Sequence, residues 1–308
     1  MLLCLTFETL SSRCRRRLTC CECLTYKAAT SDALLHLRSV LFAPGSDEDK
    51  LRKALSGDAH AVVCDLEDAV TPEEKGRARE VVVRVLSQVE SDSVRMVRVN
   101  GVGTPYLNED LEALQGVAVE AIVLPKASPD AVRALGEDGP PLLAIVETAA
   151  GLRLAHETAS ERRVFALALG AADLGAELGF EPRPDGLEML YARSKLVVDA
   201  AAAGVRPPFD VVHLDVRNTE GLEAECLLAR SLGLRGKLCI HPAQVPVVNR
   251  VFAPTPAEVE WAERVVAAFE DGVASGRGAV GLEGTMVDLP VVQRARRVLE
   301  DAKGARAT

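Results

Sequence analysis

Aromatic residues are scarce in this 308-residue chain, at 4%, although 48% of its residues are hydrophobic. The apolar content is therefore mainly Ala, Val and Leu, and such small aliphatic side chains suit a parallel sheet that helices cover on both faces. Long apolar runs are also missing, because no run reaches the ~18 residues that a membrane-spanning helix needs. We therefore expect no membrane partner.

Positive charge is in short supply as well. The chain has 36 Lys and Arg against 45 Asp and Glu, which gives a net charge of −9 at pH 7. Binding to nucleic acid requires a basic surface for the phosphates, so nucleic acid is not expected as a partner. With 26% charged residues the composition remains that of a globular protein, and the length allows one large domain or two small ones.

The cysteines do not form a disulfide framework. Three of the eight, Cys64, Cys226 and Cys239, lie within apolar segments and are expected to be small buried side chains. The other five fall within the first 23 residues: Cys4, Cys14, Cys20, Cys21 and Cys23. This distribution is typical of a reduced, cytoplasmic enzyme with an unusual leader.

The leader, residues 1–31, differs in composition from everything that follows. Its CRRRLTCCEC stretch could hold zinc, but it lacks a histidine and a second correctly spaced CxxC pair. Its arginines, with few acids between them, could alternatively belong to a transit peptide. We favour a third interpretation, a disordered extension that takes no part in the working protein.

Short apolar runs alternate with helix-like stretches from residue 38 onward. A helix expected at 47–55 begins after Ser46, and one beginning at Thr71 carries Pro72 in its first turn. The apolar runs span residues 39–43, 61–64, 94–99, 121–124, 142–146, 164–169, 209–214 and 237–240. Eight strand-then-helix units predict a (β/α)8 TIM barrel, an α/β fold, over residues 32–252. An open doubly wound sheet would carry a glycine-rich turn after its first strand, and PGSDED is not one.

The chain continues beyond the eighth unit, from residue 253 to residue 308. A helix is expected at 257–274, a short hairpin in the segment GRGAVGLEGTMVD, and a last amphipathic helix at 291–299. A barrel does not need this helical and hairpin extension. It either plugs one end of the barrel or reaches a neighbouring subunit.

Polar side chains follow nearly every predicted strand. They are Asp65, Glu67, Asp68, Arg98, Asn100, Lys126, Glu147, Asp173, Asp215 and His241, with Arg38 near the first strand. The C-terminal ends of parallel strands meet at one rim of a barrel, where active sites lie. So many polar side chains at strand ends are hard to explain by structural needs alone. This rim is therefore the candidate active site.

Glu147 and Asp173 follow the two strands of one βαβ unit, at 142–146 and 164–169, and so should lie close together. Two acids on one rim suit Mg²⁺, which keeps several waters and binds through a few carboxylates plus substrate oxygens. Solvated acids at strand ends are the alternative. No histidine pair at i, i+4 favours zinc, and no Ser or Cys sits at a nucleophile elbow.

Arg98 stays charged within an apolar context, VRVN, so it needs an anionic partner. The carboxylate of a 2-oxo or 2-hydroxy acid would serve, and so would an internal ion pair with Glu67 or Asp68. We expect Lys126 to help to neutralise the acidic rim rather than to form a Schiff base, and His241 to be a contact rather than a base. A metal beside a carbonyl would permit C–C bond cleavage or formation.

Eight segments together resemble the citrate lyase β-subunit-like family of acyl-CoA lyases, which includes malyl-CoA and citramalyl-CoA lyases within the HpcH/HpaI aldolase superfamily. They are RSVLFAPGSDEDKLRKAL, VVCDLEDAVTPEEKGRAR, VRVNGVGTPY, IVLPKA, IVETAAGL, LALGAADLGAELG, CIHPAQV and MVDLPVVQRA. The resemblance runs in order from about residue 37 to the C-terminus. The leader has no counterpart in it.

The resemblance implies a Mg²⁺-dependent TIM barrel that cleaves or forms a C–C bond in a 3-hydroxyacyl-CoA. It implies that Glu147 and Asp173 are metal ligands and that Arg98 grips the carboxylate of the 2-oxo acid. Glu67 and Asp68 would bind metal-bound waters, and Glu67 would join Arg98 among the catalytic residues.

The resemblance extends to substrate binding and assembly. It implies that Arg38 contacts the CoA phosphates or the acyl end and that His241 and Lys126 border the substrate. Asp288, in MVDLPV, matches an acid that enters the site of a neighbouring subunit as acid/base. A homotrimer or hexamer is therefore expected, with residues 253–308 at the subunit contact.

The acyl group is not readable from the sequence, since malyl-, citramalyl- and citryl-CoA differ by features that loop shape discriminates. Two alternatives to a CoA-ester lyase stay open. One is a CoA-independent class II aldolase of 2-oxo acids on the same barrel, and the other is a catalytically silent acyl-CoA-binding subunit. Binding of CoA separates the first alternative from the lyase, and turnover by the single chain separates the second.

Overall fold

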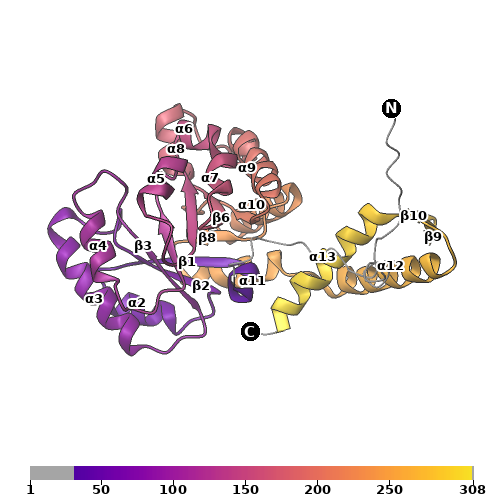
Figure 1. Ribbon diagram of the computed structural model, residues 1–308, viewed down its shortest axis with the longest axis horizontal. Coiled ribbons are helices and arrows are strands. Elements are labelled where there is room, and N and C mark those ends of the chain that lie inside the picture. Colours follow the sequence, from indigo (N-terminus) through magenta and orange to yellow (C-terminus); the bar gives the residue numbers. More distant parts are fainter. Residues whose placement is uncertain (1–30, 307–308) are drawn as a thin grey trace, which may run out of the picture.

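A sheet of eight parallel strands forms the centre of the molecule (Figure 1). The structure is a computed structural model and describes residues 31–306. The strands are β1 (Ser39–Pro44), β2 (Ala61–Asp65), β3 (Val94–Arg98), β4 (Ala121–Leu124), β5 (Leu142–Val146), β6 (Val164–Leu169), β7 (Arg206–Phe209) and β8 (Lys237–Cys239). They lie in the order β7-β6-β5-β4-β3-β2-β1-β8, and one bridge between Asp210 and Lys237 nearly closes the ring. The predicted TIM barrel is confirmed.

Helices alternate with these strands and cover the outside of the sheet. The α-helices are α1 (Asp32–Leu35), α2 (Glu48–Leu55), α3 (Lys75–Gln88), α4 (Leu107–Ala113), α5 (Pro129–Ala134), α6 (Ala149–Arg153), α7 (Ala155–Ser160), α8 (Ala171–Leu178), α9 (Leu190–Ala203), α10 (Thr219–Leu232) and α11 (Val245–Phe252). Single 3-10 turns are η2 (Pro72–Glu74), η3 (Leu187–Met189) and η4 (Pro242–Gln244). The cap of α2 is Asp47 rather than Ser46, because the Asp47 carboxylate accepts from the amide of Lys50.

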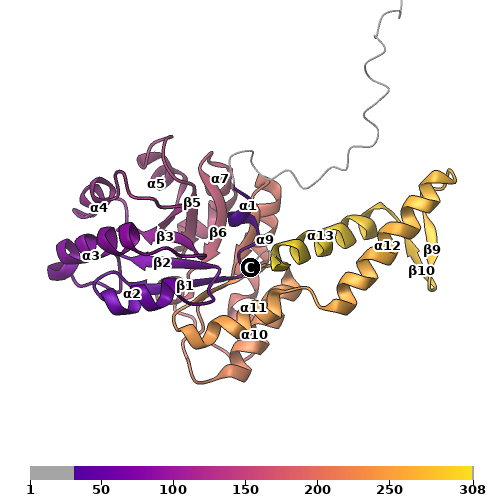
Figure 2. The ribbon, with the colours of Figure 1, turned by 90° about the horizontal axis from the view of Figure 1, so that it is seen from below.

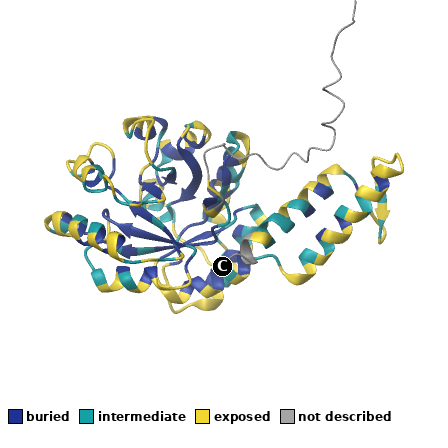
Figure 3. Ribbon diagram, turned by 60° about the horizontal axis from the view of Figure 1, so that its bottom comes forward, coloured by how far each residue is buried: buried dark blue, intermediate teal, exposed yellow. Residues whose placement is uncertain are grey.

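Strand side chains alternate between two apolar cores. Val63, Val123 and Ile145 belong to the cluster inside the barrel. Val62 and Leu124 belong to the larger cluster between the sheet and the helices. Each fully buried aliphatic side chain contributes about 1.5–3 kcal/mol to folding, so both cores hold the strand ends in fixed positions. Figure 3 shows this division, with buried strands inside and exposed outer helix faces.

The seventh strand differs from its expected position, 209–214. It spans Arg206–Phe209, and the pairing with β6 shifts register within it, where two prolines cannot donate ladder hydrogen bonds. The apolar run that suggested a later strand follows Asp210, which is fully buried in ion pairs. Between β5 and β6 the expected single helix is instead two short ones, α6 and α7, which meet at Leu154.

Residues 256–306 form an extension that we call the arm. It consists of α12 (Pro256–Ala274), the antiparallel strands β9 (Val280–Leu282) and β10 (Thr285–Val287), and α13 (Leu289–Arg306). Its helices pack on a small core of their own, which includes Val265 and Val292. Figures 1 and 2 show the arm projecting from the barrel, with the hairpin at its outer end.

The arm returns to the barrel at the C-terminal end of α13, where Arg38 donates to the carbonyl of Asp301 at 3.0 Å. No helix in the part of the chain that the structure describes is long and apolar enough to cross a membrane. The expectations for the leader concern residues 1–31, of which 1–30 lie outside the described residues.

Candidate active site

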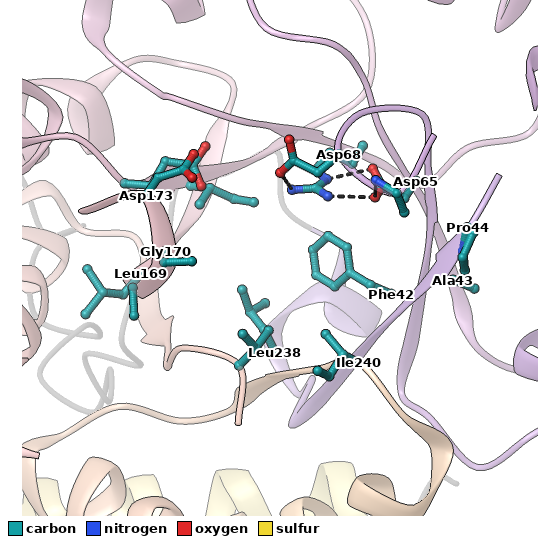
Figure 4. A pocket seen from close by; sticks show the side chains of 17 residues that line it. Phe42, Ala43, Pro44, Asp65, Asp68, Leu169, Gly170, Asp173, Leu238 and Ile240 are labelled. Carbon is teal, nitrogen blue, oxygen red and sulfur yellow. Dashed lines mark hydrogen bonds and ion pairs between the residues drawn. The ribbon is translucent and has the colours of Figure 1, made fainter. Parts of the chain in front are cut away.

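A pocket of about 410 Å³ opens at the C-terminal ends of the strands. Its apolar wall comprises Phe42, Ile145, Leu169, Val212, Leu238 and Ile240. Its charged wall comprises Asp65, Asp68, Arg98, Glu147 and Asp173. Figure 4 shows Asp173 facing Asp65 and Asp68 across the opening, with Phe42 near the centre and Leu238 and Ile240 farther below. The predicted rim therefore borders a real cavity with one charged and one apolar side.

Arg98 ends β3 and is held by a carboxylate from the neighbouring strand. Its Nε and Nη2 donate to Asp65 Oδ1 and Oδ2 at 2.7 and 2.6 Å. Nη1 lies 3.2 Å from Asp68 Oδ2 and 3.0 Å from Glu67 Oε2. The expected ion pairs with Glu67 and Asp68 are present, but the bidentate partner is Asp65, which was not among the predicted partners of Arg98.

Electrostatics and packing keep Arg98 charged and fixed. Burial acts to lower the pKa of Arg98, but the hydrogen bonds and charge of Asp65, with the charges of Glu67 and Asp68, raise it above its usual value. The Phe42 ring lies 5.1 Å from the guanidinium carbon. Because Asp65 occupies the Nε side, an incoming carboxylate can only approach Nη1 and the remaining Nη2 hydrogen.

Asp65 also organises the loop that follows β2. It is almost fully buried, and its carboxylate accepts from the amides of Glu67 and Ala69 at 2.9 and 3.1 Å. The same side chain thus sets the orientation of Arg98 and the positions of Glu67 and Asp68. Asp65 positions these side chains.

The acids on the other side of the pocket surround a single ammonium group. Lys126 Nζ lies 3.1 Å from Glu67 Oε1 and 3.4 Å from Asp173 Oδ2, and the amide of Lys126 donates to Glu147 Oε1 at 2.7 Å. Burial raises the pKa of Glu147 to about 7, opposed by that amide and assisted by the charges of Glu67 and Asp173. This side of the pocket therefore carries more negative charge than its environment stabilises.

The donor set fits a hard divalent cation. Within residues 31–306 no three His, Cys, Asp or Glu side chains gather with the spacing of a complete metal site. Two carboxylates beside open space, Glu147 and Asp173, suit Mg²⁺, which fills its other positions with water and substrate oxygens. The raised pKa of Glu147 shows that its ionised form lacks a sufficient positive partner, and a bound cation would supply that partner.

Gly170 makes room for the Glu147 carboxylate. A Cβ at this position would lie 2.6 Å from Glu147 Oε2 and 2.5 Å from Glu147 Cβ. We expect Gly170→Ala to displace the carboxylate and to weaken Mn²⁺ binding by about tenfold or more, the order that a moved charge–charge contact carries. Titration of Mn²⁺ by electron paramagnetic resonance measures this effect. Gly101→Ala is the control, because nothing lies within 4 Å of a Cβ at Gly101, and equal losses in both variants would contradict the steric explanation.

Arg38 is not a residue of this pocket, and its expected place on the active rim is wrong. It precedes β1, so it lies at the N-terminal end of the strands, on the opposite rim of the barrel. It is buried there against Asp301 of the arm, with Arg206 and Arg235 nearby. The expected contact with CoA has no support from this position.

Other predicted residues do not line the pocket. His241 caps η4, where its Nδ1 accepts from the amide of Ala243 at 3.2 Å. Asp215 accepts from the amide of Arg217, and Asn100 is buried against Asp110. Asp288 lies between β10 and α13, at the outer end of the arm and away from the pocket of its own chain (Figure 2).

A buried ionic network supports the wall formed by Val212 and Ile240. Lys237 Nζ lies 2.8 Å from Asp210 Oδ2, and Arg193 Nε lies 2.7 Å from Asp210 Oδ1. Glu225 then links Lys237, at 3.0 Å, to His213 Nδ1, at 2.9 Å. This network, which joins α9, α10 and β8, went unrecognised in the sequence, where the only available signal was charged residues within apolar runs.

Comparison with known proteins agrees with this geometry. The family model described as HpcH/HpaI aldolase/citrate lyase matches residues 38–242. A (3S)-malyl-CoA thioesterase of Cereibacter sphaeroides is 40% identical over 88% of this chain and 96% of its own length. A citrate lyase subunit beta of Leuconostoc mesenteroides is 36% identical over 85% of this chain and 92% of its own.

Among solved structures, the CitE protein of Mycobacterium tuberculosis in complex with magnesium, acetoacetate and coenzyme A superimposes with a TM-score of 0.74. It is 36% identical to this chain and covers 87% of this chain and 98% of its own. The barrel, the acidic rim and these matches lead to one conclusion. The chain belongs to the HpcH/HpaI aldolase/citrate lyase family.

Proposed function

We propose that this protein is a Mg²⁺-dependent C–C bond lyase that acts on a 3-hydroxyacyl-CoA such as malyl-, citramalyl- or citryl-CoA. One observation carries the proposal: Arg98 and the carboxylates Glu147 and Asp173 line a single pocket together with an apolar wall. Relatives in the family include a citrate lyase subunit, and the CitE structure contains magnesium, acetoacetate and coenzyme A.

Arg98 would bind the carboxylate of the 2-oxo acid part of the substrate. Asp65 occupies Nε and one Nη2 hydrogen of the Arg98 guanidinium, so Nη1 and the other Nη2 hydrogen remain for an end-on contact. A substrate carboxylate in that position competes at Nη1 with Asp68, whose side chain is 62% exposed, and with the more buried Glu67, but leaves the bidentate pair with Asp65 intact. The exposed pair with Asp68 is the one that is lost at low cost.

Glu147 and Asp173 would hold the metal ion on the other side of the pocket. The chemistry that Mg²⁺ supplies when bound is stabilisation of negative charge on an oxygen next to the C–C bond that breaks. The apolar wall, with Ile145 and Leu238, keeps water away from that region and strengthens charge interactions there.

Asp288 would act as the acid/base in the site of a neighbouring subunit. Its place at the outer end of the arm supports a homotrimer or hexamer in which the arm crosses a subunit boundary. We expect Asp288→Asn to lower the turnover by about 10²–10⁴-fold, the usual contribution of a general acid or base. CoA binding and the oligomeric state should not change, because Asn also caps a helix well and Asp288 Oδ1 accepts from the amide of Val291.

Steady-state assays, CoA titration by calorimetry and light scattering measure these three properties of Asp288→Asn. Asp271→Asn, an exposed change elsewhere on the arm, serves as the matched control. Full activity of Asp288→Asn would remove Asp288 from the mechanism. Loss of the oligomer would assign it an assembly role instead.

A mass-detected assay tests the function itself. Acetyl-CoA or propionyl-CoA is mixed with glyoxylate or pyruvate, with and without Mg²⁺. A new acyl-CoA that forms only with Mg²⁺ is the expected result, and its mass names the acyl group. Condensation that needs no CoA ester would favour the CoA-independent aldolase, and CoA binding without any product would favour the silent subunit.

Thioester hydrolysis is a second candidate function. The relative with 40% identity bears the name (3S)-malyl-CoA thioesterase, which favours release of CoA from a malyl ester. Incubation with malyl-CoA separates the two, since cleavage of the C–C bond gives acetyl-CoA and glyoxylate whereas hydrolysis gives free CoA and malate. Free CoA as the only CoA product would replace the lyase proposal with this one.

A further inference from the structure

Lys126 has an unusual backbone conformation at the edge of the acidic group. It follows β4 with φ of 47°, one of two non-glycine residues with positive φ in the described part of the chain. Such a conformation is strained for a residue with a side chain and persists only where the surroundings hold it. Here the amide of Lys126 donates to Glu147 Oε1 at 2.7 Å. A carboxylate proposed to bind metal thus also fixes the position of Lys126.

The side chain of Lys126 spans two further acids. Its Nζ lies 3.1 Å from Glu67 Oε1 and 3.4 Å from Asp173 Oδ2. The side chains of Lys126 and Asp173 are 49% and 43% exposed, whereas that of Glu67 is 10% exposed. The contact with Asp173 is therefore the longer and more solvated of the two, and it is the one that can be given up at low cost.

We propose that Lys126 is the resident cation of the metal-free site and that Mg²⁺ displaces its ammonium group from Asp173, so that metal binding is an exchange of cations. This inference rests on the proposed function, since it takes Glu147 and Asp173 as the metal ligands. It assigns to Lys126 the role of a positioning residue that limits metal affinity.

Elementary electrostatics supports the exchange. A divalent and a monovalent cation on one carboxylate repel each other, and at 4 Å this repulsion corresponds to roughly thirtyfold in affinity even in bulk water. Lysine can avoid this repulsion because its charge sits on a flexible four-carbon stem. Glu147 and Asp173 cannot move as freely, since one is buried and the other belongs to the first turn of α8. The ammonium group of Lys126 is therefore the one that moves away from Asp173 when the metal binds.

The variant Lys126→Met tests the proposal through metal affinity rather than activity. Methionine keeps the length of the side chain and removes the charge, so Mn²⁺ no longer has to expel an ammonium group from Asp173 and meets no ammonium held beside Glu67. Mn²⁺ should therefore bind roughly fivefold tighter than to the wild type, the order of a residual repulsion at about 8 Å in water. Lys126→Arg keeps the charge and should bind Mn²⁺ close to the wild-type affinity. Lys53→Met, an exposed change on α2, is the control for a lost lysine elsewhere.

A second measurement uses the wild-type protein and so does not depend on a variant that folds. Acetylation by N-acetoxysuccinimide, followed by peptide mass spectrometry, reports how freely each lysine reacts. Saturating Mg²⁺ should raise the acetylation rate of Lys126 several-fold, because the ammonium loses a carboxylate partner, and should leave that of Lys53 unchanged. An unchanged or lower rate at Lys126 would overturn the exchange.

The outcomes separate this inference from the proposed function. If the wild type and Lys126→Met bind Mn²⁺ with equal affinity, or the variant binds it more weakly, Lys126 does not compete and only this inference fails. If neither protein binds Mn²⁺, both the proposed metal-dependent function and this inference about Lys126 fail.

Discussion

Glu147→Gln and Asp173→Asn are each expected to lower metal-dependent turnover by about 10³-fold or more while the fold stays intact. Each variant removes one of two protein ligands, and the charge stabilisation that a bound metal supplies is worth several kcal/mol, where 1.36 kcal/mol is a factor of ten in rate. Circular dichroism checks the fold, Mn²⁺ titration checks the metal, and the condensation assay checks turnover. Glu157→Gln, an exposed change on α7, is the control.

The two ligand variants should differ in the stability of the metal-free protein. Burial raises the pKa of Glu147 to about 7, so ionisation of this group destabilises the fold as the pH rises from its unfolded value of ~4.3 through 7. Glu147→Gln should remove that loss of stability, whereas Asp173→Asn should keep most of it. Activity that persists in either variant without added metal would contradict the cation hypothesis.

Asp210→Asn is expected to lower the free energy of unfolding by about 3–5 kcal/mol, the cost of breaking a buried ion pair from one side. Asp210 and Lys237 are fully buried, and Arg193 is nearly so. Although burial acts to raise it, the charges of Lys237 and Arg193 keep the pKa of Asp210 below its usual value. The amide would leave both cations without their shared carboxylate. Urea denaturation followed by fluorescence and circular dichroism measures the change.

A double variant identifies the cause. Lys237→Met should cost less in the Asp210→Asn background than in the wild type, because the lysine has already lost its fully buried carboxylate partner and keeps only Glu225. Glu260→Gln, in an exposed pair with Arg264, is the control and should change stability by no more than about 0.5 kcal/mol. A loss below about 1 kcal/mol in Asp210→Asn would show that water or rearrangement satisfies the two cations.

The pairing of Asp65 with Arg98 illustrates what a sequence hides. The two residues are 33 positions apart, and the register of β2 against β3 makes them direct neighbours. Register depends on how whole strands fit together, and no local pattern encodes it. Glu67 and Asp68, which follow the same strand, were therefore equally reasonable partners until the strands were placed.

Arg38 and Asp288 differ in how far the sequence could place them. Arg38 precedes the strand expected at 39–43 and so lies on the opposite rim, whereas Asp288 lies on the arm, within the residues 253–308 expected at a subunit contact. The side of a barrel to which a residue belongs depends on which end of its strand it flanks. The subunit that an arm reaches depends on packing between chains.

The sequence by itself determined the eight strand-and-helix units, the acidic rim and the pair of carboxylates, because each depends on local periodicity and on the rule that parallel strands end together. The tertiary structure decided the limits of β7, the partner of Arg98, the ammonium of Lys126 among three acids and the ionic network around Asp210. These features join residues distant in the chain, and their energies depend on burial and on distances that exist only after folding.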